Sequence, residues 1–418
     1  MSIPLDDSGS LDDSGSLDDF VTGDDPLTDS GVFGPRRSMR TTRYEPVPTL
    51  TSHGSRRSRP DPHLIATYDK LTESDKVSWT GHYRLTRCLG RGGQGEVYLT
   101  DYRGTDGFTV PVAMKIFSPE RYSGTAAYGE AMSRIATISA RIALIQHDNL
   151  LSIQNFFERD GIRIMMMEYV DGYDLAYLVR PSCLAALAGR VSTRRWRYIN
   201  EVILTQGPTQ SRFKAGIAIA IVRECLAALA ALHRQGIMHG DIKPSNIMLK
   251  RSGHAKLIDV NAAFDVNAPP PHRDCTPMYA APEVLENGEP TIRSDLASLG
   301  YVLVQWLGGR NPFEGMRSVG QLLKAKHELP KRLAEFLPDD VLRNTLLMNF
   351  ISGLISTDVN RRFPNAEIAE HVETGAAAFH RQLVLSDMAT EYDNDIRVWL
   401  EELGRLEQTG ESTENGED

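Results

Sequence analysis

The chain has 418 residues and 41% hydrophobic content, which is enough to bury a large core. No run of 18 apolar residues occurs. The best candidate, residues 215–233, is interrupted by Arg223 and Glu224, so we expect no membrane span and interpret it as a core helix. Met1 leads almost directly into aspartates, so we expect no signal peptide, and the four cysteines have neither paired nor metal-ligand spacing. These features predict a cytoplasmic protein in a reducing compartment.

Residues 1–75 differ in composition from the rest of the chain. Nine aspartates and no basic residue lie within residues 1–29, and seven arginines follow within residues 36–59. Few apolar residues and blocks of like charge predict a disordered tail, acidic first and then basic. A solvated tail is the favoured interpretation, and docking of the tail on a partner or on a basic surface of the chain is the alternative.

The first motif is rich in glycine. Gly90, Gly92 and Gly95 form a G-x-G-x-x-G pattern, in which backbone N–H groups can approach phosphate oxygens without a side chain in the way. In a dinucleotide-binding fold this pattern would open a helix. Here residues 97–100 and 112–117 are typical of strands, so the pattern predicts a strand–turn–strand loop over phosphates.

The second of these strands contains a lysine among apolar residues. Lys115 must either extend to solvent or find an anionic partner. Glu130 is the only acidic residue between Ala126 and Gln146. Apolar residues recur around it at helical spacing, which predicts one continuous helix. These positions are Ala131, Ile135, Ile138, Ile142 and Ile145.

The most informative stretch is residues 239–246, His-Gly-Asp-Ile-Lys-Pro-Ser-Asn. It places a carboxylate, an ammonium and an amide on one short loop at Asp241, Lys243 and Asn246. Phosphoryl transfer needs a base for the attacking hydroxyl, a cation near the moving phosphoryl group and an oxygen ligand for a metal ion. Asp259, after a short apolar strand, offers a second oxygen ligand. Alone, the stretch could be a polar turn after a helix.

Three further segments follow in order. Residues 276–283 end in Ala-Pro-Glu, residues 295–300 have the sequence Asp-Leu-Ala-Ser-Leu-Gly, and Arg362 follows Glu283 by 79 residues. With the motifs above, they resemble the protein kinase family, of Ser/Thr type, over about residues 83 to 376. The resemblance implies an α+β, two-lobed protein kinase fold with a small β-rich N-lobe and a larger α-helical C-lobe. It also implies a structural ion pair between Arg362 and Glu283.

The resemblance assigns catalytic roles in the transfer of the γ-phosphate of ATP to Ser/Thr hydroxyls of protein substrates. Asp241 is the base, and Lys243 stabilises the transferring charge. Lys115, held by Glu130, positions the α and β phosphates.

The resemblance also assigns the cofactor sites. Asn246 and Asp259 hold Mg²⁺ or Mn²⁺. Met167 is the gatekeeper of the adenine site, and Asp174 receives the ribose hydroxyls. The nucleotide-binding residues are Leu89, Gly90, Gly92, Gly95, Val97, Ala113, Lys115, Met167, Glu168, Val170, Asp174 and Met248.

The chain departs from the family at several positions. Gly240 stands where most members carry arginine, and Val260 and Asn261 replace the last two residues of D-F-G. Asparagine tolerates positive φ, so we expect Asn261 to keep the backbone shape of the family's glycine. His147, in the turn after the helix, lies 17 residues past Glu130, whereas the family interval is about ten. About two extra helical turns would keep Glu130 on its original face.

These departures leave an alternative function open. It is a pseudokinase scaffold that binds nucleotide and partners without efficient phosphotransfer. Its support is Gly240, the Asp-Val-Asn variant and the long helix, whereas every group with a direct chemical role is present.

The activation loop, residues 262–275, contains no Ser, Thr or Tyr. Thr276 and Tyr279 remain, on positions that in the family contact the catalytic loop. Because Gly240 also removes the arginine that reads a loop phosphate, we predict activity that does not require loop phosphorylation.

The kinase domain is placed at about residues 80–376, with an N-lobe at about 80–170 and a C-lobe at about 171–376. An insertion lies at about residues 181–213, where four arginines surround Trp196. We interpret it as a solvated loop; a docking surface and a nucleic-acid contact are the less favoured alternatives.

The remainder, residues 377–418, is expected to form a helix and an acidic tail. The helix is placed at about residues 383–406 and carries Trp399.

Overall fold

The computed structural model describes residues 50–51, 60–73, 83–270, 274–371, 373, 375–385 and 390–414. All of them lie in the unit that spans residues 39–418. The acidic stretch at residues 1–29 and most of the basic stretch at residues 36–59 lie outside the described residues, so their disorder stays a prediction.

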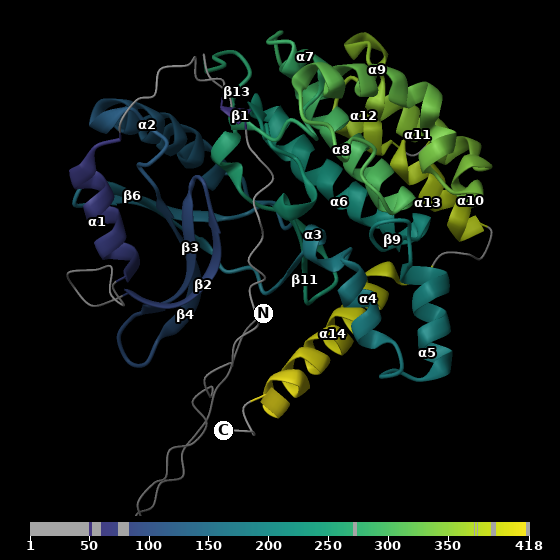
Figure 1. The fold of residues 1–418 in the computed structure, drawn as a ribbon, viewed down its shortest axis with the longest axis horizontal. Coiled ribbons are helices and arrows are strands. Elements are labelled where there is room, and N and C mark those ends of the chain that lie inside the picture. Colours follow the sequence, from purple (N-terminus) through teal and green to yellow (C-terminus); the bar gives the residue numbers. More distant parts are fainter. Residues whose placement is uncertain are drawn as a thin grey trace, which may run out of the picture. The chain divides into compact units, whose positions relative to one another are not determined.

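A five-stranded antiparallel sheet forms the base of the N-lobe (Figure 1). Neighbouring strands follow the order β2-β3-β4-β6-β5, so β4 is central. Every residue from Val112 to Phe117 on β4 is buried, because this strand runs through the core of the lobe. The strands are β2 (Tyr83–Gly92), β3 (Gly95–Arg103), β4 (Thr109–Phe117), β5 (Ile153–Arg159) and β6 (Ile162–Glu168).

Helix α2 (Gly124–Ala143) is continuous over 20 residues and packs beside β5, which confirms the predicted helix. Its buried face follows helical spacing, so the apolar pattern sets which side meets the core. The buried residues are Tyr128, Ala131, Met132, Ser139 and Ile142.

A further helix, α1 (Pro62–Glu73), packs against the same lobe. Leu64, Tyr68 and Leu71 are buried at spacings of four and three residues and form one apolar face. The prediction of disorder over residues 1–75 is therefore wrong for α1. The short apolar face escapes notice because polar sequence surrounds it on both sides.

A short strand, β1 (Leu50–Thr51), pairs antiparallel with β14 (Asp274–Cys275). The N-terminal region therefore contains a segment that lies beside the end of the activation loop, and the predicted tail is wrong at this point too.

The C-lobe is mainly helical and is built around α6 (Ala215–Arg234) and α8 (Ile292–Gly308) (Figure 1). Every residue of α8 from Ser294 onward is buried, as expected of a helix at the centre of a lobe. Helix α8 begins at a capping box formed by Thr291 and Ser294.

Helix α6 is the one described helix that is long and apolar enough, by length and composition, to cross a membrane. Of its apolar window, 67% is buried inside the fold. Helix α6 thus packs as a core helix, as the sequence analysis predicts, and its end leads toward the 239–246 loop.

The other elements of the C-lobe connect and cover these two helices. They are β7 (Gly172–Asp174), α3 (Leu175–Leu178), β10 (Ile237–Met238), η2 (Pro244–Asn246), β11 (Ile247–Lys250), β12 (Ala255–Leu257), η3 (Val260–Ala262), β13 (Phe264–Asp265), α7 (Pro282–Leu285), α9 (Val319–Phe336), α10 (Asp339–Leu342), α11 (Thr345–Ile355), η4 (Val359–Arg361) and α12 (Ala366–Glu370).

The predicted insertion is folded rather than solvated. Leu187, Ile199 and Ile203 have no exposed surface, so the interpretation of a solvated loop is wrong. The insertion contains α4 (Pro181–Leu187), α5 (Thr193–Tyr198), the π-helix η1 (Ile199–Ile203), β8 (Leu204–Thr205) and β9 (Arg212–Phe213).

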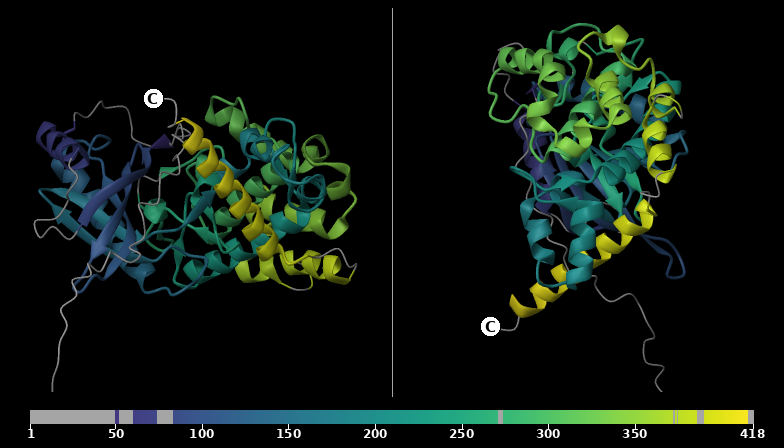
Figure 2. Two further views of the ribbon diagram at one scale, coloured as in Figure 1. Left: turned by 90° about the horizontal axis from the view of Figure 1, so that it is seen from below. Right: turned by 90° about the vertical axis from the view of Figure 1, so that its right-hand side faces the viewer.

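The insertion packs against the C-terminal helix α14 (Tyr392–Glu414), which crosses the C-lobe in Figure 2. The ring of Trp399 is fully buried and meets the ring of Phe213 edge-on at 6.1 Å. Arg195 forms a bidentate contact with Glu402, at 2.8 and 3.0 Å. An insertion and a C-terminal segment far apart in sequence therefore share one apolar interface.

The predicted single helix at about residues 383–406 is two helices in the structure. They are α13 (Ala376–Leu385) and α14, with residues 386–389 outside the described residues.

Candidate functional site

The carboxylate of Asp295, in the first turn of α8, organises the backbone of the 239–246 loop. It accepts the backbone N–H groups of His239 (2.8 Å) and Gly240 (2.9 Å), and it lies 3.0 Å from Nε2 of His233. Burial raises the pKa of Asp295, but its contacts with His233 outweigh burial, so the pKa lies below its ordinary value. The buried carboxylate of Asp295 therefore fixes the backbone at the start of the loop.

Gly240 fits this backbone in a way that other residues would not. Its φ is +79°, in the region that L side chains disfavour. A Cβ atom at this position would lie 2.6 Å from the carbonyl oxygen of Ala262. The arginine expected from the resemblance is thus replaced by a residue that the local backbone favours.

The three predicted groups of the loop meet in the structure. Lys243 Nζ lies 2.6 Å from Asp241 Oδ2 and 3.0 Å from Thr276 Oγ1. The amide nitrogen of Asn246 donates to the carbonyl oxygen of Asp241 (2.8 Å). The backbone N–H of Thr276 donates to Asp241 Oδ1 (2.9 Å). Asp241 is therefore held on both carboxylate oxygens, next to the loop that ends in Ala-Pro-Glu.

Lys115 lies on β4, and its side chain is almost entirely buried. Its ammonium is 3.1 Å from Asp259 Oδ1 and 3.4 Å from Oε1 of Gln94, in the turn of the glycine-rich loop. The side-chain amide of Asn261 also donates to Asp259. Loss of hydration raises the pKa of Asp259, but the charges of Lys115 and Lys243 outweigh it, so the pKa lies below its ordinary value.

The Asp-Val-Asn variant has a backbone that differs from the prediction. The positive φ falls on Asp259 (+60°), whereas Val260 and Asn261 belong to the 3-10 helix η3. The expectation that Asn261 adopts the positive φ of the family's glycine is therefore wrong. Asn261 instead uses its side chain, as a donor to Asp259.

The predicted pair of Lys115 with Glu130 is not formed in the described part of the chain. Glu130 is exposed on α2, and the ion pair of Lys115 is with Asp259. Thr137, seven residues further along the helix, is exposed as well. Glu130 and Thr137 thus share one face of α2, as expected for positions two turns apart, but this face points to solvent because the opposite face carries the apolar stripe.

The residues predicted as adenine walls come from the N-lobe sheet, from the segment after it and, for Met248, from β11 of the C-lobe. Ala113, Met167 and Val170 are buried, whereas Leu89, Val97 and Met248 are partly buried and pack against the core. Asp174 caps helix α3, since its Oδ1 accepts the N–H of Tyr177 (2.9 Å). The walls are apolar with few polar groups, as a nucleotide-base site requires.

A second buried lysine, which the sequence did not lead us to expect, lies next to Glu168 of the predicted nucleotide site. Lys256 on β12 is buried, and its ammonium lies 2.6 Å from Glu168 Oε1 and 3.3 Å from the carbonyl oxygen of Leu150. Lys256 stands between apolar residues in a strand, as Lys115 does, and this pattern was the available signal.

The glycine-rich loop is the turn between β2 and β3. Gly95 has a φ of +132°, and a Cβ there would lie 2.0 Å from the carbonyl oxygen of Ile116 on the neighbouring strand. Gly90 and Gly92 have no atom within 4 Å of such a Cβ, so their backbones are open on that side. Gly95 is therefore required by the close strand, and Gly90 and Gly92 leave room for a ligand.

Asn246 and Asp259 fit a hard divalent cation. The Asn246 amide nitrogen is used toward Asp241, so its oxygen is the end left for a ligand. The contacts of Lys115 and Asn261 with Asp259 both go to Oδ1 rather than Oδ2. An amide oxygen and a carboxylate oxygen are donors that Mg²⁺ and Mn²⁺ accept.

The activation loop is tied to the N-lobe by ion pairs. Arg141 on α2 lies 2.5 Å from Asp265 Oδ2 and donates to the carbonyl oxygen of Gln235 (2.5 Å). Arg121 lies 2.8 Å from Asp274 Oδ1. Two aspartates of the loop thus form ion pairs with arginines that a phosphate on the loop could otherwise bind.

Side-chain contacts with Gln305 and Arg362 fix the 276–283 segment on the C-lobe. The phenol of Tyr279 donates to Gln305 Oε1 (2.7 Å) on α8. Arg362 forms a bidentate pair with Glu283 at 2.6 and 2.8 Å, which confirms the predicted pair. Burial raises the pKa of Glu283, but Arg362 outweighs it, and the pKa lies below its ordinary value.

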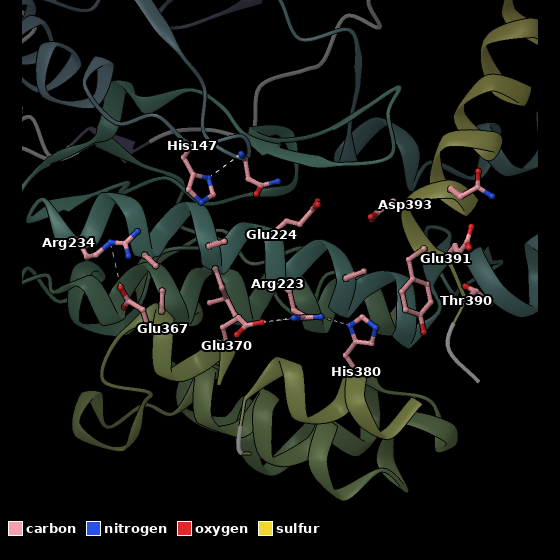
Figure 3. A pocket seen from close by; sticks show the side chains of 18 residues that line it. His147, Arg223, Glu224, Arg234, Glu367, Glu370, His380, Thr390, Glu391 and Asp393 are labelled. Carbon is pink, nitrogen blue, oxygen red and sulfur yellow. Dashed lines mark hydrogen bonds and ion pairs between the residues drawn. The ribbon is translucent and has the colours of Figure 1, made fainter. Parts of the chain in front are cut away.

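A cavity of about 880 Å³ lies elsewhere, between α6 and the helices that follow α11 (Figure 3). Its charged groups face each other: Arg223 contacts Glu370 (2.8 Å) and His380, and Arg234 lies 4.0 Å from Glu367. None of the predicted site residues lines it. This cavity is therefore separate from the candidate site.

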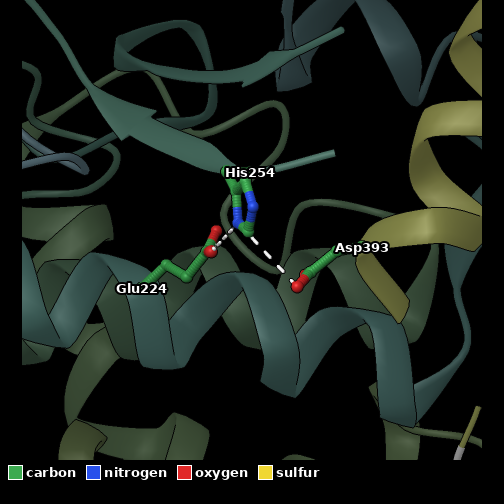
Figure 4. A group of neighbouring side chains, drawn as sticks. All are labelled: Glu224, His254 and Asp393. Carbon is green, nitrogen blue, oxygen red and sulfur yellow. Dashed lines mark hydrogen bonds and ion pairs between the residues drawn. The ribbon is translucent and has the colours of Figure 1, made fainter. Parts of the chain in front are cut away.

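Beside this cavity, a histidine and two carboxylates join three segments (Figure 4). His254 Nδ1 lies 2.7 Å from Glu224 Oε1 and 3.9 Å from Asp393 Oδ2. The other oxygen of Glu224 accepts the N–H of Ala255 (2.5 Å). This group fastens the start of α14 to α6 and to the β11–β12 turn.

Comparisons with known proteins agree with this geometry. Residues 83–372 match the family model described as protein kinase domain. Serine/threonine-protein kinase Pkn1 of Myxococcus xanthus is 28% identical over 77% of this chain. PknH of Mycobacterium tuberculosis is 31% identical over 59%, and PrkC of Bacillus subtilis is 28% identical over 70%.

The chain spans less than half the length of these relatives, namely 44%, 34% and 40%. Among solved structures, the kinase domain of PknI from Mycobacterium tuberculosis aligns with 74% of this chain and 98% of that chain, with a TM-score of 0.48 and 23% identity.

Proposed function

Because the chain belongs to the protein kinase domain family, we propose that it is an enzyme that transfers the γ-phosphate of ATP to serine and threonine hydroxyls of proteins. The observation that carries the proposal is the meeting of Asp241, Lys243 and Asn246 on one rigid loop beside Thr276. Base, cation and oxygen ligand are the groups that phosphoryl transfer requires.

Asp241 receives the proton in the proposed reaction. The substrate hydroxyl oxygen forms a bond to the γ-phosphorus, the bond from that phosphorus to the bridging oxygen of ADP breaks, and the hydroxyl proton passes to the carboxylate of Asp241. The N–H of Thr276 fixes this carboxylate. Lys243, 2.6 Å away, offsets the negative charge that collects on the transferring group.

Asn246 and Asp259 would hold Mg²⁺ or Mn²⁺, which when bound neutralises charge on the phosphates. Lys115, already beside Asp259, would contact the same phosphates. Leu89, Val97, Ala113, Met167, Val170 and Met248 would enclose the adenine. A cytoplasmic setting, where ATP is supplied, fits this part of the chain.

Replacement of Asp241 tests the proposal. Asp241→Ala should lower γ-phosphate transfer from labelled ATP by roughly 10²–10⁴-fold, because it removes the base. Asp339→Ala, in an exposed ion pair on α10, is the control and should keep the wild-type rate. Equal rates for the wild type and Asp241→Ala would instead favour the pseudokinase scaffold.

A further inference from the structure

Lys326 on α9 is a buried charge with no role in the reaction described above. It has no exposed surface, and it lies on the apolar stripe of its helix with Leu322, Ala325, Leu329 and Leu333. Lysine is almost never fully buried unless its ammonium is paired. A leucine or methionine would fill this position without the loss of hydration that a charge suffers.

The surroundings of Lys326 supply three contacts. Its ammonium donates to the carbonyl oxygen of Met278 (2.8 Å). It also lies 3.9 Å from the ring centroid of Phe313 and 4.1 Å from that of Tyr301, within the range of a cation–π contact. Burial lowers the pKa of Lys326 well below its ordinary value. A neutral amine would still donate an N–H group to the same carbonyl oxygen.

The carbonyl that Lys326 holds is close to the reacting groups in sequence and in space. Met278 follows Thr276 by two residues, and Thr276 contacts both Asp241 and Lys243. The side chain of Met278 is partly exposed. A substrate whose hydroxyl reaches Asp241 must therefore place its neighbouring residues along this loop.

We propose that Lys326 is a positioning residue that fixes residues 276–280 for the protein substrate. The phenol of Tyr279 anchors the same loop through Gln305, to which Asn311 also donates (3.1 Å). Lys326 contacts the loop from α9, so two consecutive residues, Met278 and Tyr279, are hydrogen-bonded to the C-lobe helices. This inference rests on the proposed kinase function, because it concerns how that site receives a protein.

Kinetics of Lys326→Met test the positioning role. Methionine nearly keeps the volume of the side chain and lacks its amine, so the fold should persist. The KM for a peptide chosen from a Ser/Thr peptide array should rise roughly tenfold, since the hydrogen bond that holds the loop is lost. The KM for ATP should not change. Lys324→Met, on an exposed position of the same helix, should match the wild type in both constants.

Hydrogen exchange gives a readout that does not require phosphotransfer. In Lys326→Met, amides of residues 276–283 should exchange faster than in the wild type, whereas those of α8 should not. If the loop is released but neither protein transfers phosphate, the proposed function fails and the positioning of the loop stands. Unchanged exchange together with an unchanged peptide KM would overturn the positioning role.

A second variant covers the case in which Lys326→Met does not fold. Lys326→Gln keeps an N–H donor on a shorter side chain, so it should give a peptide KM and loop exchange between those of the wild type and the methionine variant. A lower melting temperature with wild-type KM and wild-type loop exchange would show a purely structural lysine and would also overturn the proposal.

Discussion

The 239–246 loop and helix α2 border the same site, but they differ in whether their charged side chains have partners within the same lobe. In the loop, Asp241 contacts Lys243 and Thr276, which both belong to the C-lobe. In the N-lobe, the ammonium of Lys115 finds its carboxylate on Asp259 of the C-lobe, while the one acidic residue of α2, Glu130, is exposed.

This difference indicates which half of the site depends on the approach of the two lobes. The loop is fixed by Asp295 from within its own lobe, so its geometry does not need the N-lobe. The position of the Lys115 ammonium depends on the contact between the lobes, because its carboxylate partner in the described part of the chain is Asp259 of the C-lobe. Pairing across the lobes replaces the lysine–helix pair that the resemblance implies.

The largest expected effect separates Lys115 from Glu130. Lys115→Met should abolish measurable phosphotransfer, because the cation beside the phosphates is lost. Glu130→Gln should keep the wild-type rate, because Glu130 is exposed and Lys115 pairs elsewhere. Rates of both variants would be measured with saturating peptide and varied ATP.

A loss of activity in Glu130→Gln comparable with that in Lys115→Met would break the comparison. It would mean that α2 rotates to bring Glu130 to Lys115 when nucleotide binds.

A middle-sized effect is expected at Gly240. Gly240→Ala should destabilise the protein by roughly 1–3 kcal/mol, because alanine disfavours positive φ and its Cβ would lie 2.6 Å from the Ala262 carbonyl oxygen. Gly129→Ala on α2 is the matched control, since nothing lies within 4 Å of its added Cβ. That control should be slightly stabilising, as alanine in a helix is favoured over glycine.

Chemical denaturation would compare the two glycine variants. If Gly240→Ala unfolds at the same denaturant concentration as the wild type, the 239–246 backbone can relax, and the view that the C-lobe half of the site is rigid is lost.

Local chemistry made the 239–246 loop predictable. A carboxylate, an ammonium and an amide lie within six residues, so Asp241, Lys243 and Asn246 could be identified without knowledge of the fold. The continuous α2 followed from its apolar period for the same reason. The partner of Lys115 did not, because a period gives the buried face and not which neighbour that face meets.

Long-range packing explains the remaining errors. The insertion is predicted as solvated from its cluster of arginines, whereas in the fold it packs against α6 and against α14, about 200 residues later. Helix α1 was not predicted, because the charged composition of residues 1–75 as a whole indicates disorder. Lys256 and Lys326 stand in apolar patterns, and only the fold shows that their ammoniums reach Glu168 and the carbonyl oxygen of Met278.

The smallest expected effect concerns the activation loop, which joins the two regions. Phosphatase-treated protein should keep its catalytic rate, because residues 262–275 hold no acceptor hydroxyl. Asp265 and Asp274 already occupy Arg141 and Arg121. Mass spectrometry before and after treatment would establish which hydroxyls carried phosphate.

Arg141→Gln sharpens this prediction, because it removes the contacts of α2 with Asp265 and with the Gln235 carbonyl oxygen without altering the sequence of the loop. The pair is partly exposed, so its loss should lower the rate less than about fivefold, in line with about 0–1 kcal/mol for such pairs. Arg134→Gln, on an exposed position of the same helix, should leave the rate unchanged. A large drop after phosphatase treatment that maps to Thr276 or Tyr279 would contradict the prediction that activity does not require phosphorylation of the loop.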